Sequence, residues 1–397
     1  MDTNNNKKRI AIVGLNIYPI PSIKGGAIEK GMTELIEQND KNHQFDFTVY
    51  TVTDKDLDDI SYKYTKIVQI SEKGFLSFVL LFYRAIRKLL RNRIPLRTIY
   101  MTRINRHLLR NNYDVVYFAT SNELVAQVDR RLESKILYGV YSDYLRKESY
   151  GIDLICNRIT AFVANQYLQS RILAELNIAK EKTLLLIGGG NIHPIAEEDI
   201  PKIRTTIRNQ YNINNDDVLV VYTGRLSPEK GPLELIKAIK LVPECKLILV
   251  GGSNFSKNEM TDYIKQLHAE ADKCEGRVVF TGYVPDHNDV YRVMASADIG
   301  VVPSICNEAG SAALLEFRFV KVPTVYSNKG GMPYYAGRGS LAVECDDDYV
   351  HNLAEGIRKL ANDKELRRSM SSVTKEGLEE YTGEAYFSRF VNMINNL

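Results

Sequence analysis

Residues 217–239 read DVLVVYTGRLSPEKGPLELIKAI. The first part, up to Gly224, is a short β-branched run that predicts a buried strand. The part from Pro232 onward has apolar residues at helical spacing and predicts a helix. A strand that is apolar on both faces is typical of a parallel sheet covered by helices on both sides. This stretch therefore predicts one strand-loop-helix unit of an α/β fold.

The same alternation of short apolar runs and longer helical patterns occurs twice along the chain. The two sets of runs cover residues 9–15, 45–52, 113–119, 134–140 and 161–166, and then 217–224, 245–252, 277–282, 298–304 and 322–328. Two such sets predict two doubly wound, Rossmann-like parallel-sheet domains, in residues 1–200 and 201–375. Glycines, prolines and an acidic cluster in residues 188–201 predict the boundary, and a helix should follow at about 202–211. Residues 376–397 are expected to form a C-terminal helix that packs back on the N-terminal domain.

The composition is that of a globular protein. The 397 residues include 44% apolar and 25% charged residues, and 52 basic against 49 acidic side chains leave a formal charge of +3. This length favours two or three domains over a single small module. The longest apolar run, residues 75–83, is much shorter than the roughly 20 residues of a membrane-spanning helix, and the N-terminus lacks the pattern of a secretory signal. We therefore expect a cytoplasmic protein.

No metal site is predicted. The five cysteines are widely spaced and never form a C-x-x-C pair, which also argues against a disulfide framework. None of the six histidines lies at ligand spacing from another. The acidic clusters at residues 54–56 and 346–348 are expected to be solvated loops.

The loops that follow the predicted strands carry the candidate site, because ligands of open parallel sheets bind beyond the carboxyl ends of the strands. In the first of these loops the strand ends at Gly224, Arg225 follows at once, and Lys230 precedes a helix. Arg225 as a bidentate fork and Lys230 as a point charge could clamp a diphosphate. The alternative is a solvated loop with ordinary cations.

A second loop lies within DIGVVPSICNEAGSAALLEFRFV, residues 298–320. On one continuous helix Glu308 and Glu316 would be roughly 80° out of phase. If Glu308 lies in the loop and a helix begins near Ser311, both carboxylates can face one ligand, and the amides of Ala309, Gly310 and Ser311 can receive a phosphate. The alternative is that Glu308 stabilises the helix start electrostatically and Glu316 is an exposed helix charge.

Taken in this order and spacing, the motifs resemble the retaining glycosyltransferases of family 4, whose GT-B fold has two Rossmann-like domains facing a central cleft. The resemblance is strongest from GRLSPEKG (residues 224–231) through LILVGG, VVFTGYV and ASADIGVVPS to the Glu-x7-Glu pattern. PSIKGGAIE, residues 21–29, is similar to the glycine loop of members that act on spore coats or envelope polysaccharides.

The resemblance implies roles for the donor-side residues, with residues 201–375 as the nucleotide-sugar domain. Arg225 and Lys230 would hold the nucleotide diphosphate and offset the charge on the leaving group. Glu308 would face the donor hexose and, with these two cations, carry the catalysis. Glu316 would accept hydrogen bonds from the ribose hydroxyls.

Further roles follow from the same resemblance. Backbone groups near Tyr283 and Val284 would meet the base. Gly25 and Gly26 would let the helix of the N-terminal, acceptor-side domain approach the phosphates when the cleft closes.

The chain departs from the family pattern on the acceptor side. Many members carry a His after a strand similar to ILYGV, residues 136–140, whereas here Tyr141 follows and Asp143 lies two residues later. Tyr141 and Asp143 are therefore the acceptor-side candidates.

The implied reaction moves a hexose from a nucleotide sugar, expected to be a UDP-sugar, to a polysaccharide or lipid-linked acceptor. A diphosphate oxygen would take the proton of the acceptor hydroxyl as the sugar bond breaks, with retention and without metal or other cofactor. Two alternatives stay open: a noncatalytic GT-B coat or scaffold protein, and a sugar-nucleotide epimerase.

A basic segment in the first half predicts a further partner. Residues 74–113 contain nine Lys and Arg and no Asp or Glu, and the apolar residues of 75–91 recur at helical spacing. A basic amphipathic helix suits an anionic leaflet, so Arg84, Arg87, Lys88 and Arg91 predict a peripheral position at the inner face of the plasma membrane. The alternative is an ordinary core helix with solvated arginines. Nucleic acid is not expected, because no aromatic-basic interleaving accompanies the charge.

Overall fold

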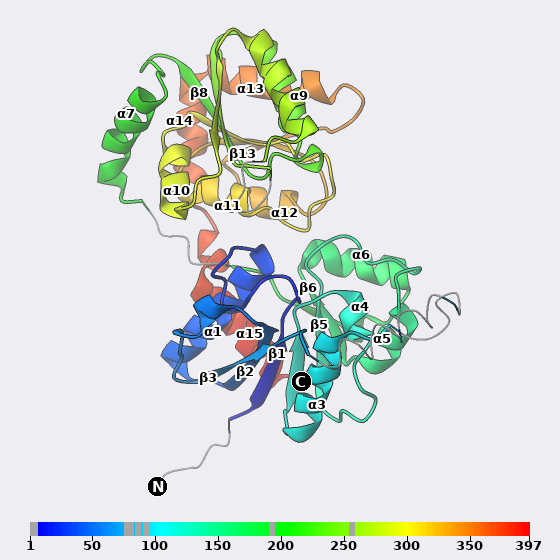
Figure 1. Cartoon of the computed structure of the whole chain (residues 1–397). Helices are drawn as coiled ribbons and strands as arrows, with labels where there is room; N and C mark the ends of the chain where they lie inside the picture. The colour runs from blue at the N-terminus through cyan, green and yellow to red at the C-terminus, as the bar shows by residue number, and fades with distance from the viewer. Residues whose placement is uncertain (1–6, 75–82, 84–88, 90–95, 190–194, 254–258) are drawn as a thin grey trace. The chain divides into compact units, whose positions relative to one another are not determined.

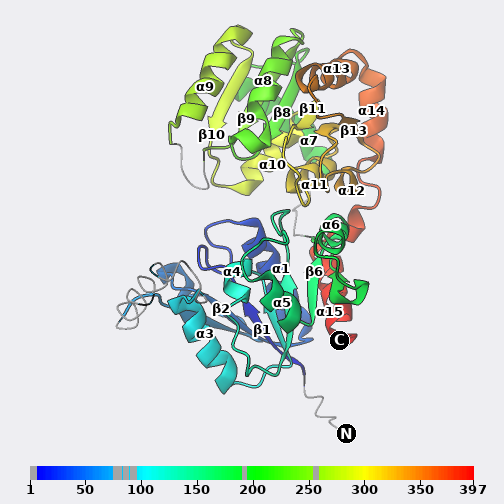
Figure 2. The same cartoon turned by 90° about the vertical axis from the view of Figure 1, so that its right-hand side faces the viewer.

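The computed structural model describes residues 7–74, 83, 89, 96–189, 195–253 and 259–397. The chain divides into two compact units, Met1–Gly190 with Gly383–Leu397, and Asn191–Thr382. Each unit has one parallel β-sheet with helices on its faces (Figures 1 and 2). The predicted fold class of two doubly wound α/β domains is confirmed.

The sheet of the first unit has seven strands in the order β3-β2-β1-β4-β5-β6-β7. Their bounds are β1 Arg9–Val13, β2 Asp46–Val52, β3 Thr65–Ile70, β4 Val115–Phe118, β5 Lys135–Gly139, β6 Ala161–Ala164 and β7 Thr183–Leu185. All five predicted runs are strands. The unpredicted β3 and β7 are the two edges; β3 includes Lys66 and Gln69, and β7 is only three residues long.

Helices of the first unit come from both ends of the chain. They are α1 Ala27–Asn42, α3 Ile99–Arg110, α4 Asn122–Val125, α5 Ile152–Arg158, α6 Gln166–Leu176 and α15 Gly383–Asn395. The C-terminal helix α15 packs against α1, as Figure 1 shows. Its Phe390 is fully buried and meets Phe45, Phe47 and Tyr117 edge-on. Burial of such a side chain contributes about 1.5 to 3 kcal/mol, which accounts for the attachment of α15 to this unit.

The second unit has a six-stranded sheet in the order β10-β9-β8-β11-β12-β13. Its strands are β8 Val218–Thr223, β9 Cys245–Val250, β10 Val278–Gly282, β11 Ile299–Val302, β12 Thr324–Ser327 and β13 Ser340–Val343. Its helices are α7 Ile200–Gln210, α8 Pro232–Lys240, α9 Asp262–Ala271, α10 His287–Ala295, α11 Ala312–Phe319, α12 Pro333–Ala336, α13 Tyr349–Asn362 and α14 Lys364–Val373. The five predicted runs are again strands, and the unpredicted β13 is an edge.

The strand order identifies where each sheet should bind a ligand. In the second unit the chain builds outward from β8 to β10 and then crosses to β11, so β8 and β11 flank the switch point. In the first unit β1 and β4 do so. Loops that leave two such strands diverge and open a crevice at the carboxyl ends, so the loops after β8 and β11 are placed to share one ligand.

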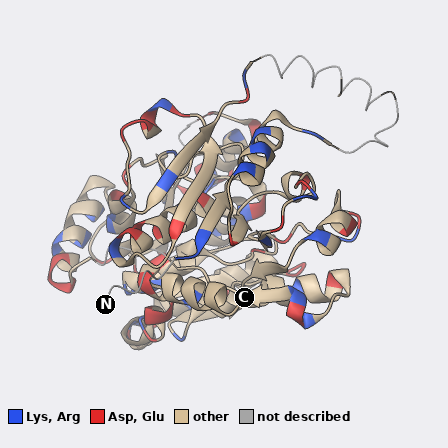
Figure 3. Ribbon diagram, turned by 90° about the horizontal axis from the view of Figure 1, so that it is seen from below, with Lys and Arg blue, Asp and Glu red and all other residues tan. Residues whose placement is uncertain are grey.

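Lys and Arg residues are interspersed with Asp and Glu residues along the described ribbon (Figure 3). Within the ranges given above, no helix is long and apolar enough to cross a membrane. Arg84, Arg87, Lys88 and Arg91 lie outside the described residues, so the predicted basic helix stays a prediction.

Candidate functional site

The loop after β8 carries the two predicted cations. Arg225 directly follows Gly224, and its guanidinium lies 3.3 Å from the carboxylate of Glu229. Glu229 also accepts a hydrogen bond from the Ser227 hydroxyl at 2.7 Å. Lys230 ends the short 3₁₀ turn Pro228–Lys230, and its Nζ lies 3.0 Å from Oε1 of Glu308. Both cations thus have carboxylate partners within the loops.

Glu308 comes from the loop after β11, as predicted. Helix α11 begins only at Ala312, and the Ser311 side chain caps it by accepting a hydrogen bond from the amide of Leu314. The carboxylate of Glu308 accepts a hydrogen bond from the Ser304 hydroxyl and has only 10% of its side chain exposed. Of the two arrangements that the sequence left open, the structure has the one in which Glu308 lies in the loop before a helix that starts near Ser311. Glu308 pairs with Lys230 rather than standing alone at the helix start.

Close backbone packing holds the two loops together. The carbonyl of Glu229 accepts a hydrogen bond from the amide of Ile305 at 3.1 Å. Gly231 has φ +70, and a Cβ there would lie 2.0 Å from the carbonyl oxygen of Pro303. Only glycine fits this position without displacement, because the backbones of the β8 and β11 loops touch.

The glycine pair after β12 completes this arrangement. The amide of Gly331 donates to the carbonyl of Glu308 at 2.7 Å, and a Cβ on Gly330 would lie 2.4 Å from that same oxygen. Gly310, in the β11 loop, is equally crowded, since its Cβ would meet the Tyr335 ring at 2.6 Å. These glycines therefore set the position of the Glu308 backbone. The pair Gly330 and Gly331 has a packing role, because both residues lie against that backbone.

Glu316 lies on α11 and has a partner that the sequence analysis missed. Its Oε1 is 2.9 Å from Nε2 of His287, the first residue of α10. Tyr283 and Val284, half-buried, lie between β10 and this helix. No spacing in the sequence links His287 to Glu316, because their helices meet only after folding.

The glycine loop of the first unit begins α1. Gly25 and Gly26 have φ +85 and +99, and Gly26 takes the N-cap position without a side-chain cap. The side chain of Glu29 lies over it, since a Cβ on Gly26 would meet Oε2 at 2.0 Å. Burial raises the pKa of Glu29 above its ordinary value. A buried carboxylate at this helix start was not among the predicted residues.

The two acceptor-side candidates are both engaged inside the first unit. The Tyr141 hydroxyl lies 2.6 Å from that of the fully buried Tyr117, and burial raises the pKa of Tyr141. Asp143 has 4% of its side chain exposed and accepts hydrogen bonds from Arg146 at 3.0 Å and Tyr167 at 2.8 Å. Burial acts to raise the Asp143 pKa, but these donors and Arg171 hold it below its usual value. Both side chains thus have partners within the first unit, and their roles toward an acceptor stay a prediction.

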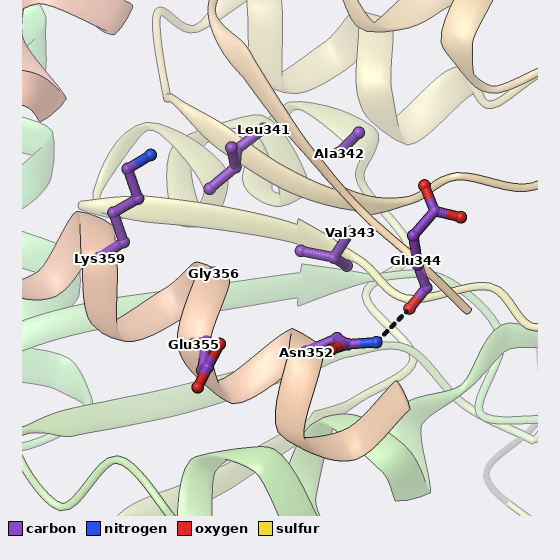
Figure 4. A pocket seen from close by; sticks show the side chains of 8 residues that line it. All are labelled: Leu341, Ala342, Val343, Glu344, Asn352, Glu355, Gly356 and Lys359. Carbon is purple, nitrogen blue, oxygen red and sulfur yellow. Dashed lines mark hydrogen bonds between the residues drawn. The ribbon is translucent and has the colours of Figure 1, made fainter. Parts of the chain in front are cut away.

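A surface hollow lies elsewhere, at the outer edge of the second sheet (Figure 4). It is formed by β13 and α13, and the side-chain amide of Asn352 donates to the carbonyl of Glu344 there at 3.1 Å. None of the predicted site residues lines it. Among the residues that the structure describes, no group of three or more His, Cys, Asp or Glu could hold a metal ion.

Comparisons with known proteins show what this chain is similar to in sequence. Residues 203–377 match the family model of the glycosyl transferases group 1. The chain is 21% identical to spore coat protein SA of Bacillus subtilis (strain 168), over 94% of this chain and 96% of that protein. It is 29% identical to a lipopolysaccharide 1,2-N-acetylglucosaminetransferase of Salmonella typhimurium, over 48% of this chain and 51% of that enzyme.

Solved structures show the same fold. Anabaena Alr3699/HepE in complex with UDP superposes with a TM-score of 0.75 at 18% identity, over 98% of this chain and 100% of that one. The same protein with UDP-glucose gives a TM-score of 0.74 at 19% identity over the same shares. The fold, the domain match and the relatives together support a GT-B glycosyltransferase whose residues 203–377 are similar to the glycosyl transferases group 1.

Proposed function

We propose that this protein is a retaining, family 4 hexosyltransferase that uses a UDP-sugar and serves bacterial envelope glycan synthesis. Its acceptor is a polysaccharide or a lipid-linked glycan. The proposal rests on the ion pair between Lys230 and Glu308 at the switch point of the second sheet. Arg225 lies in the same loop as Lys230. Two cations and a carboxylate at that place suit a sugar diphosphate, whose two ends need opposite partners.

The choice of donor draws on solved relatives. Anabaena Alr3699/HepE was solved with UDP and with UDP-glucose, which supports a uridine diphosphate sugar for this chain. The Salmonella relative is a lipopolysaccharide transferase, which supports an envelope acceptor.

The chemistry follows from the charges. As the bond between the sugar C1 and the diphosphate oxygen breaks, negative charge grows on the leaving group, and Arg225 and Lys230 stabilise it. The acceptor hydroxyl forms the new bond to C1 on the same face and passes its proton to a diphosphate oxygen. Lys230 can turn from Glu308 to the phosphates, which leaves Glu308 to accept hydrogen bonds from the sugar hydroxyls. We propose that this step needs neither metal nor cofactor.

Turnover of nucleotide sugars tests the proposal. The protein is incubated with UDP-glucose, UDP-galactose, UDP-N-acetylglucosamine and GDP-mannose, with and without acceptor glycans and with and without a chelator. Release of diphosphate nucleotide and an axial product linkage from an axial donor, seen by NMR, would support retaining transfer. An inverted linkage or loss of activity with the chelator would contradict the retaining or metal-free parts.

Two other outcomes would favour the alternatives. Epimerised nucleotide sugar without transfer would identify an epimerase. Binding without turnover of any donor would favour a noncatalytic coat protein, an option that similarity to spore coat protein SA keeps relevant.

We also propose a peripheral position at the cytoplasmic face of the membrane. Support comes from the nine cations of residues 74–113, which have no acidic residue among them. A lipid-linked acceptor would be presented at the same surface.

A further inference from the structure

The two carboxylate oxygens of Glu316 differ in their hydrogen-bond partners. Oε1 lies 2.9 Å from Nε2 of His287. The hydrogen bond to His287 uses Oε1 alone among the described residues, and 13% of the Glu316 side chain stays exposed to solvent. A carboxylate that is mostly buried and paired on one side keeps acceptor capacity for a ligand on the other.

The His287 ring is itself held in place. It is the first residue of α10, whose N-cap Asp286 accepts a hydrogen bond from the amide of Asn288 at 2.9 Å. The ring meets the buried Tyr291 edge-on, with centroids 4.6 Å apart and an interplanar angle of 80°. The contacts with Tyr291 and Glu316 fix the orientation of the imidazole. The His287 side chain is still 42% exposed.

We infer that His287 is a positioning residue that orients the Glu316 carboxylate for the ribose diol of the donor nucleotide. The inference rests on the proposed function, since it takes a nucleotide as the ligand. A glutamate has three side-chain torsions to order, and a partner that orders them beforehand lowers the cost of binding. His287 follows Tyr283 and Val284, the segment expected to meet the base, within a few residues. Its ring also contacts Glu316, the carboxylate expected to meet the ribose, so one side chain connects the two parts of the nucleotide site.

The experiment compares UDP with 2′-deoxy-UDP by calorimetric titration. The ratio of the two affinities isolates the ribose 2′-hydroxyl, because the diphosphate and base are the same. His287→Phe keeps an aromatic ring against Tyr291 but removes the donor to Glu316, and His287→Gln restores a donor. His268→Phe is the matched control, since His268 lies on α9 and its ring packs 4.1 Å from Phe280.

The expected result is a selective loss. Loss of a charge-assisted hydrogen bond should weaken UDP binding by up to about tenfold in His287→Phe, with 2′-deoxy-UDP little changed. His287→Gln should recover most of the preference for UDP, and His268→Phe should behave as wild type.

Two results overturn the inference in distinguishable ways. If wild type prefers UDP and His287→Phe keeps that preference, or loses affinity for both nucleotides equally, His287 only links two helices and the proposed function stands. If wild type binds none of UDP, GDP and ADP, the proposed function fails and this inference fails with it.

Discussion

Nζ of Lys230 lies 3.0 Å from Oε1 of Glu308, so an anion that takes Lys230 must displace a carboxylate. The two residues come from loops that follow different strands, β8 and β11, on either side of the switch point. This ion pair makes the affinity for a diphosphate and the rate of transfer respond differently to the same substitution.

Glu308→Gln should bind free UDP about threefold more tightly while slowing transfer by about tenfold or more. The neutral amide no longer competes for Lys230, but it also fails to hold the sugar hydroxyls. Calorimetry and a steady-state transfer assay measure the two effects. Glu270→Gln, which breaks the ion pair between Glu270 at the end of α9 and the nearby Lys273, should change neither. Weaker UDP binding by Glu308→Gln would show that the Lys230 pair does not oppose the diphosphate.

Arg225→Ala and Lys230→Ala should each slow transfer by at least about tenfold, a loss of about 1.4 kcal/mol of transition-state stabilisation. The physical reason is that each cation offsets charge that develops on the leaving diphosphate. Lys240→Ala, at the exposed end of α8, is the control cation and should keep the wild-type rate. A nearly normal kcat/KM in both site variants would contradict the assignment of Arg225 and Lys230 to the diphosphate.

Glu316→Gln should weaken UDP and UDP-sugar binding alike, by up to about tenfold, because it lowers the acceptor strength offered to the ribose. Glu308→Gln should instead lose affinity mainly for the sugar-bearing donor. Titration of both ligands into both variants provides the comparison. Equal profiles for the two variants would contradict separate ribose and hexose roles.

Gly231→Ala should lower the free energy of unfolding by about 1 to 3 kcal/mol or displace the β11 loop, since a Cβ would lie 2.0 Å from the Pro303 carbonyl oxygen. Gly276→Ala is matched to it: φ there is +76, but nothing lies within 4 Å of the added Cβ. The difference between their calorimetric midpoints therefore measures crowding apart from backbone strain. Equal midpoints would mean that the two loops relax at no cost.

Liposome co-sedimentation should rise with the content of anionic lipid and fall as salt is added, at about 1 kcal/mol for each engaged cation. Replacing Arg84, Arg87, Lys88 and Arg91 with Gln should remove most of the binding without changing UDP affinity. If the wild-type protein does not bind anionic liposomes at low salt, the proposed peripheral membrane position is wrong.

The sequence alone predicted every strand except β3, β7 and β13, and it offered a loop position for Glu308 before a helix near Ser311 as one of two arrangements. These features are local: side-chain periodicity decides the strand, and a small residue with a hydroxyl decides the cap. The edge strands β3, β7 and β13 were missed because β3 is interrupted by polar residues and β7 and β13 are very short, whereas the edge strand β10 was predicted from its apolar run. The positions of Arg225 and Lys230 between a strand and a helix already suggested a diphosphate clamp, and the family resemblance added their roles toward the leaving group.

The pairings were decided only by the tertiary structure. Lys230 meets Glu308 because β8 and β11 lie side by side in the sheet, and His287 meets Glu316 because α10 packs beside α11. Tyr141 shows the same dependence, since its hydroxyl lies 2.6 Å from that of Tyr117, a residue of β4, while its role toward an acceptor stays a prediction. Strand order and helix neighbours arise from burial summed over a whole domain, so residues far apart in the chain acquire partners that no local pattern encodes.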